Sequence, residues 1–407
     1  MIRPRLMMLG LCLLSAVGAW ASTEQIIYNF RNASDGAYPV DYGHLWRDSS
    51  GVLYGTAAGG GRCGNGTVFK LAPLGKTWKE TTLHSFCNVD GEAPEGDVIL
   101  DASGNIYGTT QGGYPSCRSS CGTVFKLSKA GKFTVLYSFT GGNDGASPAS
   151  GVIRDKNGNL YGTTYLGGAN NNGVVYRISS SGKFSVIYTF CSSGTCLDGA
   201  NPLSGLAMDE LGHLYGTTYI GGDYGSGVVF ELRESKGTWS EVILHSFAGV
   251  PTDGAGPEGG TVTLGTRTVG TKKQLLIFGV TAFGGTDYAG IAFELAKVGD
   301  GYTYNVIYNF TSEGGDGQAP YGSLLLRNGK LFGTTELGGS SFGTVFELTE
   351  NQRSWKESVL YDFNSTDGNG PLSGVVADSD NNLYGVAYSG GDGCNGEGCG
   401  VVFEITP

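Results

Sequence analysis

Short apolar runs alternate with polar, glycine-rich breaks along the whole chain. Residues 151–190 hold one complete set of four runs, GVIRD, NLYGTT, GVVYRI and FSVIYTF. The runs are rich in Val, Ile, Tyr, Phe and Thr, and the breaks consist mainly of Gly, Asn, Ser and Asp. This pattern is typical of short β-strands joined by tight turns. We therefore predict that residues 151–190 form a four-stranded antiparallel meander.

The same set of runs occurs in seven copies. A D-G pair followed by a proline marks each copy, an aromatic residue before a glycine marks the second run, and motifs such as GTVFKL and VLYSF mark the third and fourth. The copies are about 54 residues apart, with one longer interval. The aspartates of the D-G pairs are Asp35, Asp90, Asp144, Asp198, Asp253, Asp316 and Asp367. A period of this length indicates repeated supersecondary units.

The two ends of the repeat region complement each other. The first run after the N-terminal leader is a fourth run, residues 26–30, and the last is a third run, residues 401–405. In a ring the first strand would complete the last sheet, which is how propellers remove their terminal edges. We predict an all-β fold, a seven-bladed β-propeller of four-stranded antiparallel blades, closed by the N-terminal strand in the last blade. An open array of repeats is the alternative.

Adjacent residues are apolar within runs such as VFKL and LYGT, so both faces of each blade should be buried against neighbouring blades. A glycine inside the second run, such as Gly162, would weaken a strand, so its recurrence indicates a bulge or a close contact between blades. The chain has 407 residues, 72 glycines and 15% charged residues. This composition fits a packed β protein with many turns, and it excludes collagen-like and disordered chains.

The N-terminus has the pattern of a signal peptide at residues 1–21. Arg3 and Arg5 precede an apolar run, and Ala19-Trp20-Ala21 supplies a small-x-small cleavage pattern. Lipidation of a leader cysteine is disfavoured because a leucine stands where a small residue is expected. Residues 22–407 should then be a single propeller domain, exported to the periplasm or the medium and monomeric. No later apolar stretch is long enough to span a bilayer, and no C-terminal anchor is visible.

The charge balance narrows the range of partners. After removal of the leader, 24 basic residues face 37 acidic ones, so the net charge moves from −11 to about −13. Such a balance argues against nucleic acid or an anionic membrane as partner.

The cysteines outside the leader predict disulfides, since an even number in an exported chain is typical of a disulfide framework. These eight cysteines are Cys63, Cys87, Cys117, Cys121, Cys191, Cys196, Cys394 and Cys399. Spacing favours local pairs of 117 with 121, 191 with 196 and 394 with 399, which leaves 63 with 87. All eight fall in loops that share one rim of the predicted ring. A zinc site is the alternative, but the spacings lack the usual C-x2-C knuckle.

Candidate catalytic residues are few. His84 and His245 occupy the slot that tyrosine fills in the other fourth runs, and His213 replaces a turn asparagine, so we interpret all three as structural. Residues 339–343 match G-x-S-x-G by letters only, because the strand-to-helix context of a nucleophile elbow is missing. We predict no catalytic residue and no resident metal.

The repeated aspartates have two interpretations. Those of the D-G pairs could bind calcium as a ring of carboxylates. Asp-Gly is also ordinary turn chemistry, with the carboxylate accepting backbone N–H bonds, and this interpretation is favoured. A second series begins a D-x-x-G-N turn and is interpreted in the same way: Asp48, Asp101, Asp155, Asp209 and Asp378.

The loops that vary between copies are the better candidates for function. Four aromatic residues in these loops lie among polar neighbours on the cysteine-rich rim: Tyr114, Tyr224, Tyr288 and Phe342. Aromatic rings over polar groups can hold a sugar or a peptide. The alternative is that they only cover neighbouring loops. The fifth copy also carries an extension, TLGTRTVGTKKQ, which predicts a longer hairpin that either is a tolerated insertion or contacts a partner.

The repeat resembles the GloVer tandem repeat of exported bacterial "choice-of-anchor" proteins. The resemblance rests on G-x-L-x-x-D-x-x-G-N-L-Y-G-T-T-x-x-G-G, then G-T-V-F-K-L, then L-Y-S-F-x-x-x-D-G-x-x-P, which recur in this order through almost all of the mature chain. It implies export, and often a C-terminal sorting segment, which this chain does not show after residue 401. It implies no activity and no catalytic residues.

The sequence thus favours an exported, non-catalytic binding scaffold for an extracellular carbohydrate or protein. The first alternative is a polysaccharide-acting enzyme, a glycoside hydrolase or lyase, which would need two non-repeated acids facing each other across a groove. The second is a purely structural component of the cell envelope.

Overall fold

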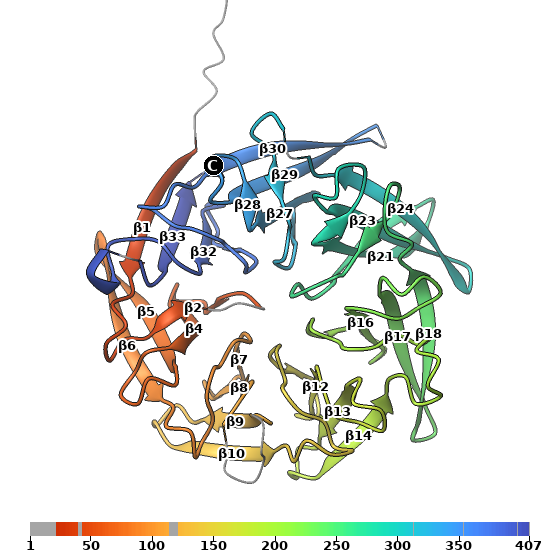
Figure 1. The fold of residues 1–407 in the computed structure, drawn as a ribbon, viewed down its shortest axis with the longest axis horizontal. Helices are drawn as coiled ribbons and strands as arrows, with labels where there is room; N and C mark the ends of the chain where they lie inside the picture. Colours follow the sequence, from red (N-terminus) through yellow and green to blue (C-terminus); the bar gives the residue numbers. More distant parts are fainter. Residues whose placement is uncertain are drawn as a thin grey trace, which may run out of the picture.

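Antiparallel strands arranged around a central axis make up the described chain (Figure 1). The computed structural model describes residues 22–39, 43–113, 121–311, 313–352, 354–396 and 398–406. These residues contain no α-helix and a single 3-10 turn, η1 (Cys394–Gly396). No helix in this part of the chain is long and apolar enough to cross a membrane.

The strands form seven blades, numbered here in chain order, with strand 1 of each blade nearest the axis. Blades 1 to 3 consist of β3 (Trp46–Arg47), β4 (Leu53–Gly59), β5 (Thr67–Leu74) and β6 (Thr77–Ser85); β7 (Ile99–Leu100), β8 (Ile106–Thr110), β9 (Thr123–Leu127) and β10 (Phe133–Ser138); and β11 (Ile153–Arg154), β12 (Leu160–Thr164), β13 (Val174–Ile178) and β14 (Phe184–Thr189). Blades 4 and 5 consist of β15 (Ala207–Met208), β16 (Leu214–Thr218), β17 (Val228–Ser235) and β18 (Thr238–Ser246); and β20 (Thr263–Val269), β21 (Lys272–Thr281), β23 (Ile291–Val298) and β24 (Gly301–Asn309). Blades 6 and 7 consist of β26 (Leu325–Arg327), β27 (Lys330–Thr335), β29 (Thr344–Asn351) and β30 (Ser354–Asp362); and β31 (Val376–Ala377), β32 (Leu383–Ala387), β33 (Val401–Thr406) and β1 (Thr23–Asn29). The predicted seven-bladed propeller is confirmed.

The N-terminal strand closes the ring. Strand β1 pairs antiparallel with β33, from Thr23 opposite Thr406 to Asn29 opposite Val401, and so becomes the outermost strand of blade 7. The terminal edges of the repeat array are thereby paired with each other, which removes two free strand edges. The predicted closure is confirmed, and the open array is excluded.

Short strand pairs occur at three of the junctions between blades. They are β2 (Ala37–Pro39) with β4, β19 (Gly254–Ala255) with β22 (Phe283–Gly284), and β25 (Gly317–Gln318) with β28 (Leu337–Gly338). Each pair joins the segment after a D-G aspartate to the segment after strand 2 of the following blade. These pairs connect neighbouring blades through backbone hydrogen bonds.

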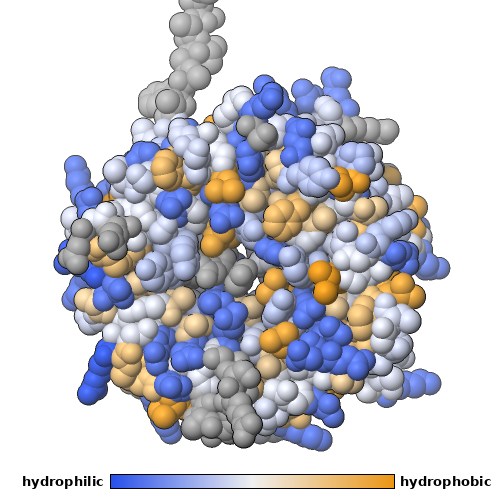
Figure 2. All heavy atoms as spheres, viewed as in Figure 1, coloured by the Kyte–Doolittle hydropathy of each residue, from blue (hydrophilic) through white to orange (hydrophobic). Residues whose placement is uncertain are grey.

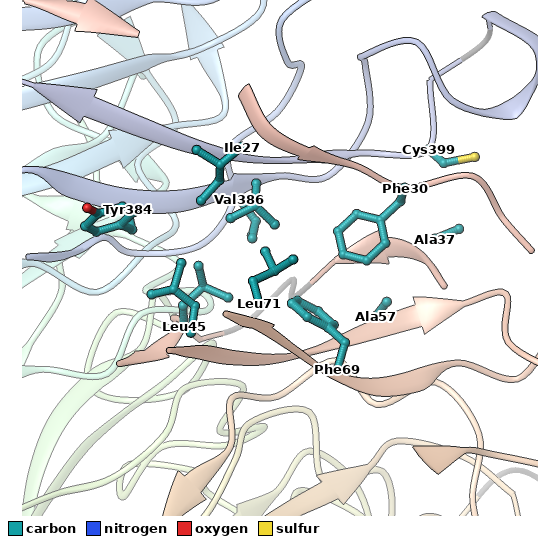
Figure 3. Packing of buried hydrophobic residues seen from close by; sticks show 12 residues of the cluster. Ile27, Phe30, Ala37, Leu45, Ala57, Phe69, Leu71, Tyr384, Val386 and Cys399 are labelled. Atoms are coloured by element: carbon teal, nitrogen blue, oxygen red, sulfur yellow. The ribbon is translucent and has the colours of Figure 1, made fainter. Parts of the chain in front are cut away.

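The core consists of apolar layers between blades. Seven buried clusters occur, and each contains side chains from two neighbouring blades. Between blades 7 and 1, for example, Phe30 packs edge-on against Phe69 at a centroid distance of 5.1 Å, with Leu71 and Val386 beside them (Figure 3). Both faces of a blade are therefore buried, as the double-sided apolar runs predict.

The recurring glycine of strand 2 gives room to an aromatic ring. A Cβ on Gly216 would lie 2.7 Å from Cζ of Phe230 in the adjacent strand 3, and one on Gly162 would lie 2.4 Å from the Tyr176 hydroxyl oxygen. Neither distance is possible for a real Cβ, so only glycine fits. The predicted close contact is present, but it lies within one blade and not between two.

The two faces of the ring differ in their loops. We call the face with the loops between strands 2 and 3, and between strand 4 and the next blade, the stapled rim; the other face, with the loops between strands 1 and 2 and between strands 3 and 4, is the turn rim. On the turn rim β20 and β21 form the predicted long hairpin of blade 5, paired from Thr263 opposite Phe278 to Val269 opposite Lys272. Strand 1 of every other blade has two or three residues, so this hairpin is an exception in the ring.

Candidate functional site

Disulfides lie in loops of the stapled rim. Among the described residues they link Cys63 to Cys87, Cys191 to Cys196 and Cys394 to Cys399, with Cα–Cα distances of 5.2, 4.1 and 5.6 Å. Each is a pair that the spacing predicted. Cys117, the predicted partner of Cys121, lies outside the described residues.

The aspartates of the D-G pairs hold the chain as it leaves strand 4. In every blade the carboxylate contacts the Tyr hydroxyl or His ring nitrogen of that strand at 2.8 to 3.0 Å. It also accepts a backbone N–H bond from the residue three positions after that side chain, as Thr140 donates to Asp144 at 2.9 Å. A β-bulge just before the Tyr or His recurs in each blade, because one strand-4 residue has no partner in strand 3. These groups are fully used in folding, which supports the turn interpretation.

The same contacts account for two of the four histidines. His84 Nε2 lies 2.9 Å from Asp90 Oδ2, and His245 Nε2 lies 2.9 Å from Asp253 Oδ2. Both rings also stack on an aromatic residue of the next blade, His245 on Tyr304 at a centroid distance of 3.5 Å. Both histidines therefore take the strand-4 position that tyrosine has in the other blades, as the sequence predicts. No group of three or more His, Cys, Asp or Glu among the described residues is arranged to hold a metal ion.

The second aspartate series pairs with the tyrosine of strand 2. In blades 1, 2, 3, 4 and 7 the Tyr hydroxyl donates to the aspartate at 3.1 to 3.3 Å. Blades 5 and 6 lack this aspartate, and there the tyrosine is replaced by Phe278 and Phe332. The hydroxyl and the carboxylate are thus lost together, which indicates a structural pair. Although burial opposes it, the bonds from Asn159 and the backbone lower the pKa of Asp155.

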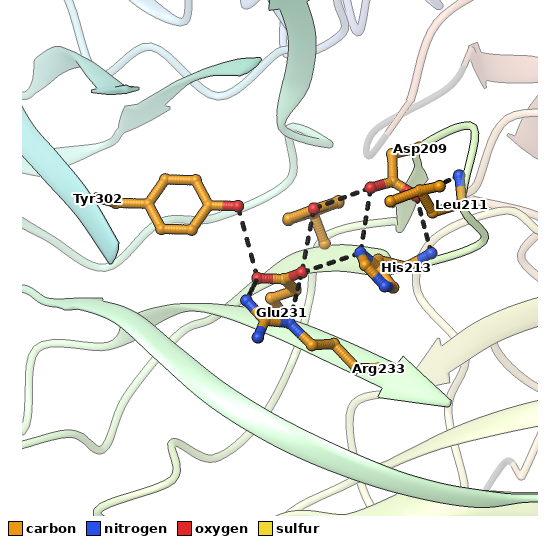
Figure 4. A network of polar contacts seen from close by, with 7 residues as sticks. Asp209, Leu211, His213, Glu231, Arg233 and Tyr302 are labelled. Carbon is orange, nitrogen blue, oxygen red and sulfur yellow. Dashed lines mark hydrogen bonds and ion pairs between the residues drawn. The ribbon is translucent and has the colours of Figure 1, made fainter. Parts of the chain in front are cut away.

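The densest polar network lies beneath the turn rim of blade 4 (Figure 4). Glu231 is fully buried, and Arg233 donates to both of its oxygens at 2.8 and 2.7 Å. Tyr215 donates to Glu231 at 3.2 Å and to Asp209 at 3.1 Å. His213 Nδ1 lies 3.2 Å from Asp209 and 3.1 Å from Glu231, in the place where other blades have an asparagine. Burial alone would raise the pKa of Glu231, but Arg233, Lys297 and His213 together lower it.

Two clefts flank the blade 5 hairpin on the turn rim, each with a volume of about 980 Å³. The wall toward blade 4 includes Leu264, Leu275 and the exposed Leu211. The wall toward blade 6 includes Arg267, whose guanidinium lies 3.3 Å from Glu294 and 3.9 Å from Glu350. A smaller cleft of about 480 Å³ lies between blades 3 and 4.

Some of the charged groups on the turn-rim side pair with one another. Arg267 lies between two glutamates, Arg233 binds Glu231, and Lys330 lies 2.8 Å from Glu347. The tryptophans of the clefts also have structural contacts, since Trp239 and Trp355 pack edge-on against Tyr161 and Phe278 of the preceding blade. The turn rim therefore has space for a ligand, and some of its charged groups, such as Arg267, already have partners.

The aromatic residues predicted for the stapled rim differ in exposure. Tyr224 and Tyr288 are 66% and 68% exposed, on equivalent loops of blades 4 and 5. Phe342 is half-buried and packs against the core cluster between blades 6 and 7. No ring contact between described residues joins these side chains. Tyr114 lies outside the described residues.

A second set of apolar residues on the stapled rim escaped the sequence analysis. Leu166, Ile220, Phe283 and Leu337 occupy equivalent positions just after strand 2 in blades 3 to 6, and we call them the apolar crescent. Ile220, Phe283 and Leu337 are 41%, 40% and 43% exposed. Blades 1, 2 and 7 have Gly59, Gly112 and Ser389 there. Figure 2 looks onto this rim and shows apolar residues around the central opening.

Two carboxyl groups lie beside the crescent. Glu258 accepts hydrogen bonds from Tyr219 of blade 4 and Tyr321 of blade 6. The rings of Tyr219 and Phe283 both face Gly256, where an added Cβ would lie 3.0 Å from each. Burial raises the pKa of Glu258, and the nearby Glu336 raises it further; burial likewise raises the pKa of Glu336.

The stapled rim of blades 3 to 6 has no positive charge. The loops that form it, residues 139–152, 165–173, 190–206, 219–227, 247–262, 282–290, 310–324, 336–343 and 363–375, contain no Lys, Arg or His. They contain ten acidic residues: Asp144, Asp198, Asp223, Asp253, Glu258, Asp287, Glu313, Asp316, Glu336 and Asp367. Among the described residues, every ion pair of a Lys or Arg lies on the turn-rim side.

Comparison with known proteins identifies the repeat and the fold. A sequence profile described as the Gloeobacter/Verrucomicrobia repeat matches residues 17–210, 119–277 and 267–407. No curated protein sequence matches. A candidate 6-phosphogluconolactonase from Bacteroides uniformis has a similar structure, with a TM-score of 0.51 at 12% identity over 84% of this chain and 89% of that one. A polysaccharide lyase, an ulvan lyase, gives 0.50 at 8% identity over 91% and 94%. At these identities the likeness shows the fold alone.

Proposed function

Because the chain belongs to the Gloeobacter/Verrucomicrobia repeat family and its repeats close into one propeller, we propose that it is an exported, non-catalytic binding scaffold. Its ligand is an extracellular carbohydrate or protein, and its ligand surface is the stapled rim of blades 3 to 6. One observation carries this proposal. The repeated polar groups are used in folding, whereas the apolar crescent is confined to four of the seven blades, and three of its four side chains, Ile220, Phe283 and Leu337, are exposed.

The acids of the molecule do not favour the enzyme alternative. A glycoside hydrolase needs one carboxylic acid with a raised pKa and a second carboxylate that stays ionised. In the blade 6 cleft, burial and Glu350 raise the pKa of Glu294, but the Arg267 guanidinium lies between the two carboxyl groups, so they do not face each other across an open groove. On the stapled rim the pKa values of Glu258 and Glu336 are both raised, so this pair lacks the ionised member. A binding role needs neither condition.

Binding and cleavage are tested together with the secreted full-length chain. The chain is applied to arrays of bacterial and plant glycans and of extracellular protein domains, and each bound ligand is assayed for release of reducing ends or peptides. We expect binding without release. Release of products would support the enzyme alternative, and absence of both would favour a structural envelope component.

A matched pair of variants tests the location of the surface. Ile220→Ser with Leu337→Ser removes exposed apolar area from the crescent, and we expect affinity to fall about tenfold. Leu211→Ser removes a leucine that is 78% exposed on the turn rim, and it should leave binding unchanged. The opposite result would place the ligand in the clefts beside the blade 5 hairpin.

A further inference from the structure

The charge of the stapled rim selects the class of partner. Across blades 3 to 6 its loops carry ten acids and no basic residue, while the Lys and Arg residues of these blades lie on strands and on the turn rim. The five D-G carboxylates of this set accept hydrogen bonds that leave their negative charge in place, and Asp253 also contacts the His245 ring. The field of such a surface attracts cations and repels anions. An acidic polysaccharide is therefore disfavoured here.

The apolar part of the rim separates polypeptides from sugars. Three of the four crescent residues, Leu166, Ile220 and Leu337, are aliphatic, and Phe283 is the single ring. Sugars are usually held by stacking on flat aromatic faces, whereas branched aliphatic side chains pack best against other apolar side chains. The crescent alternates with carboxyl groups, since Glu258 lies beside Tyr219 and Phe283, and Glu336 immediately precedes Leu337.

We propose that the stapled rim of blades 3 to 6 docks a basic polypeptide segment that carries apolar side chains. Its apolar side chains cover the crescent, and its Lys or Arg side chains lie against Glu258 and Glu336 and against the exposed Asp223 and Asp287. This inference rests on the proposed function, because it takes the stapled rim as the ligand surface. It adds the chemistry of the partner.

The environment of the two glutamates supports a cationic partner. Burial raises the pKa of both glutamates, and Glu336 raises that of Glu258 further, so no neighbouring cation offsets their burial. The groups that face Glu258 are Tyr219, Tyr321 and Glu336, and none of them is a cation. A bound ammonium or guanidinium group would favour ionisation of both carboxyl groups. Binding should accordingly strengthen as the pH rises through and above the usual titration range of a glutamate.

The test uses short fluorescent peptides and the secreted full-length chain. The probe alternates Lys and Leu, and its controls replace Lys with Glu or Leu with Ser. Fluorescence anisotropy should show the Lys/Leu probe binding about tenfold more tightly than either control, with a loss of affinity at high salt. Glu258→Gln with Glu336→Gln should weaken this binding about tenfold, as should Ile220→Ser with Leu337→Ser. Glu210→Gln with Glu234→Gln, two exposed acids of the turn rim, should change nothing.

The outcomes separate the two proposals. If a glycan binds the crescent and the Lys/Leu probe shows no preference over its controls, the basic partner is overturned and the binding scaffold stands. If chitosan oligomers bind and the peptide does not, or if the chain binds only a second copy of itself, the basic polypeptide is overturned in the same way. If the probe binds equally well to the turn-rim and stapled-rim variants, the attraction is non-specific and the inference is wrong. If nothing binds the rim, both proposals fail.

Discussion

The two rims of the ring use their charged side chains in opposite ways. On the turn-rim side, buried carboxylates such as Glu231 and Glu294 have an arginine within ion-pair distance, and the turn aspartates accept several hydrogen bonds. On the stapled rim of blades 3 to 6 the acids have tyrosine and backbone donors and no cation. The disulfide there, Cys191–Cys196, lies within one loop, and no ion pair of a Lys or Arg among the described residues lies on this rim. On the turn rim, arginines thus neutralise buried carboxylates. The stapled rim has an excess of negative charge that a partner can neutralise.

Removing the Cys63–Cys87 disulfide should have the largest effect on stability. Cys63 and Cys87 are 24 residues apart, so Cys63→Ala with Cys87→Ala releases a long loop in the unfolded chain. We expect a loss of roughly 3 kcal/mol in the free energy of unfolding, measured by urea denaturation. Cys191→Ala with Cys196→Ala is the matched control, because its loop spans only 5 residues and should cost about 1 kcal/mol less. Equal losses for the two pairs would contradict the loop-entropy explanation.

Three glutamates that lie between neighbouring blades, beneath the stapled rim, should make the protein less stable as the pH rises. Glu24, Glu241 and Glu357 each approach the D-G aspartate of the preceding blade, and each has one buried oxygen without a hydrogen-bond partner. Burial, with the charge of the aspartate, raises their pKa values to about 7, 8 and 7. Unfolded glutamate titrates near pH 4.3, so the folded state binds more protons between about pH 4 and pH 8. Stability should therefore fall by roughly 1 to 3 kcal/mol from pH 5 to pH 8.

The turn rim supplies the contrast for this prediction. Hydrogen bonds there lower the pKa of Asp101 and Asp155 against the effect of burial, so their stabilisation is present above about pH 4 and lost below it. Urea unfolding at several pH values distinguishes the two windows. Glu241→Gln should flatten the slope between pH 5 and pH 8 and leave the acid limb unchanged. If the free energy of unfolding rises between pH 5 and pH 8, or if this substitution does not change its pH dependence, Glu24, Glu241 and Glu357 are not the cause.

The sequence predicts the ring well because its signals are local and repeated. The apolar runs, the turn residues and the complementary end runs specify seven blades and their closure by β1. The chemistry of the rims depends on contacts between copies. Phe342 lies in the blade 6 loop that is equivalent to the loops of Tyr224 and Tyr288. It directly precedes Gly343, just before strand 3, and it packs between blades 6 and 7.

The exposure of the apolar crescent also could not be predicted from the sequence. A signal for it is present in the sequence, because Leu166, Ile220 and Phe283 each precede a Gly-Gly pair, as Leu337 does. Whether such a side chain is covered depends on the loop that arrives from the preceding blade, which no local pattern specifies. The difference in charge between the two rims could not be predicted from local sequence patterns either. It becomes visible only when the loops of several blades are placed on one face.

The smallest expected effect concerns a single hydroxyl of the turn rim. Tyr107 donates to Asp101 at 3.1 Å, and blade 5 has a phenylalanine in this position and no aspartate. Tyr107→Phe should cost about 1 kcal/mol, and Asp101→Ala should cost more, because Asp101 also accepts bonds from Ser103 and Asn105. In a double-mutant cycle measured by urea unfolding, the coupling between the two sites should be about 1 kcal/mol. Additive losses would mean that the joint absence of the hydroxyl and the carboxylate from blades 5 and 6 has another cause, and that the turn rim does not hold its acids through these tyrosines.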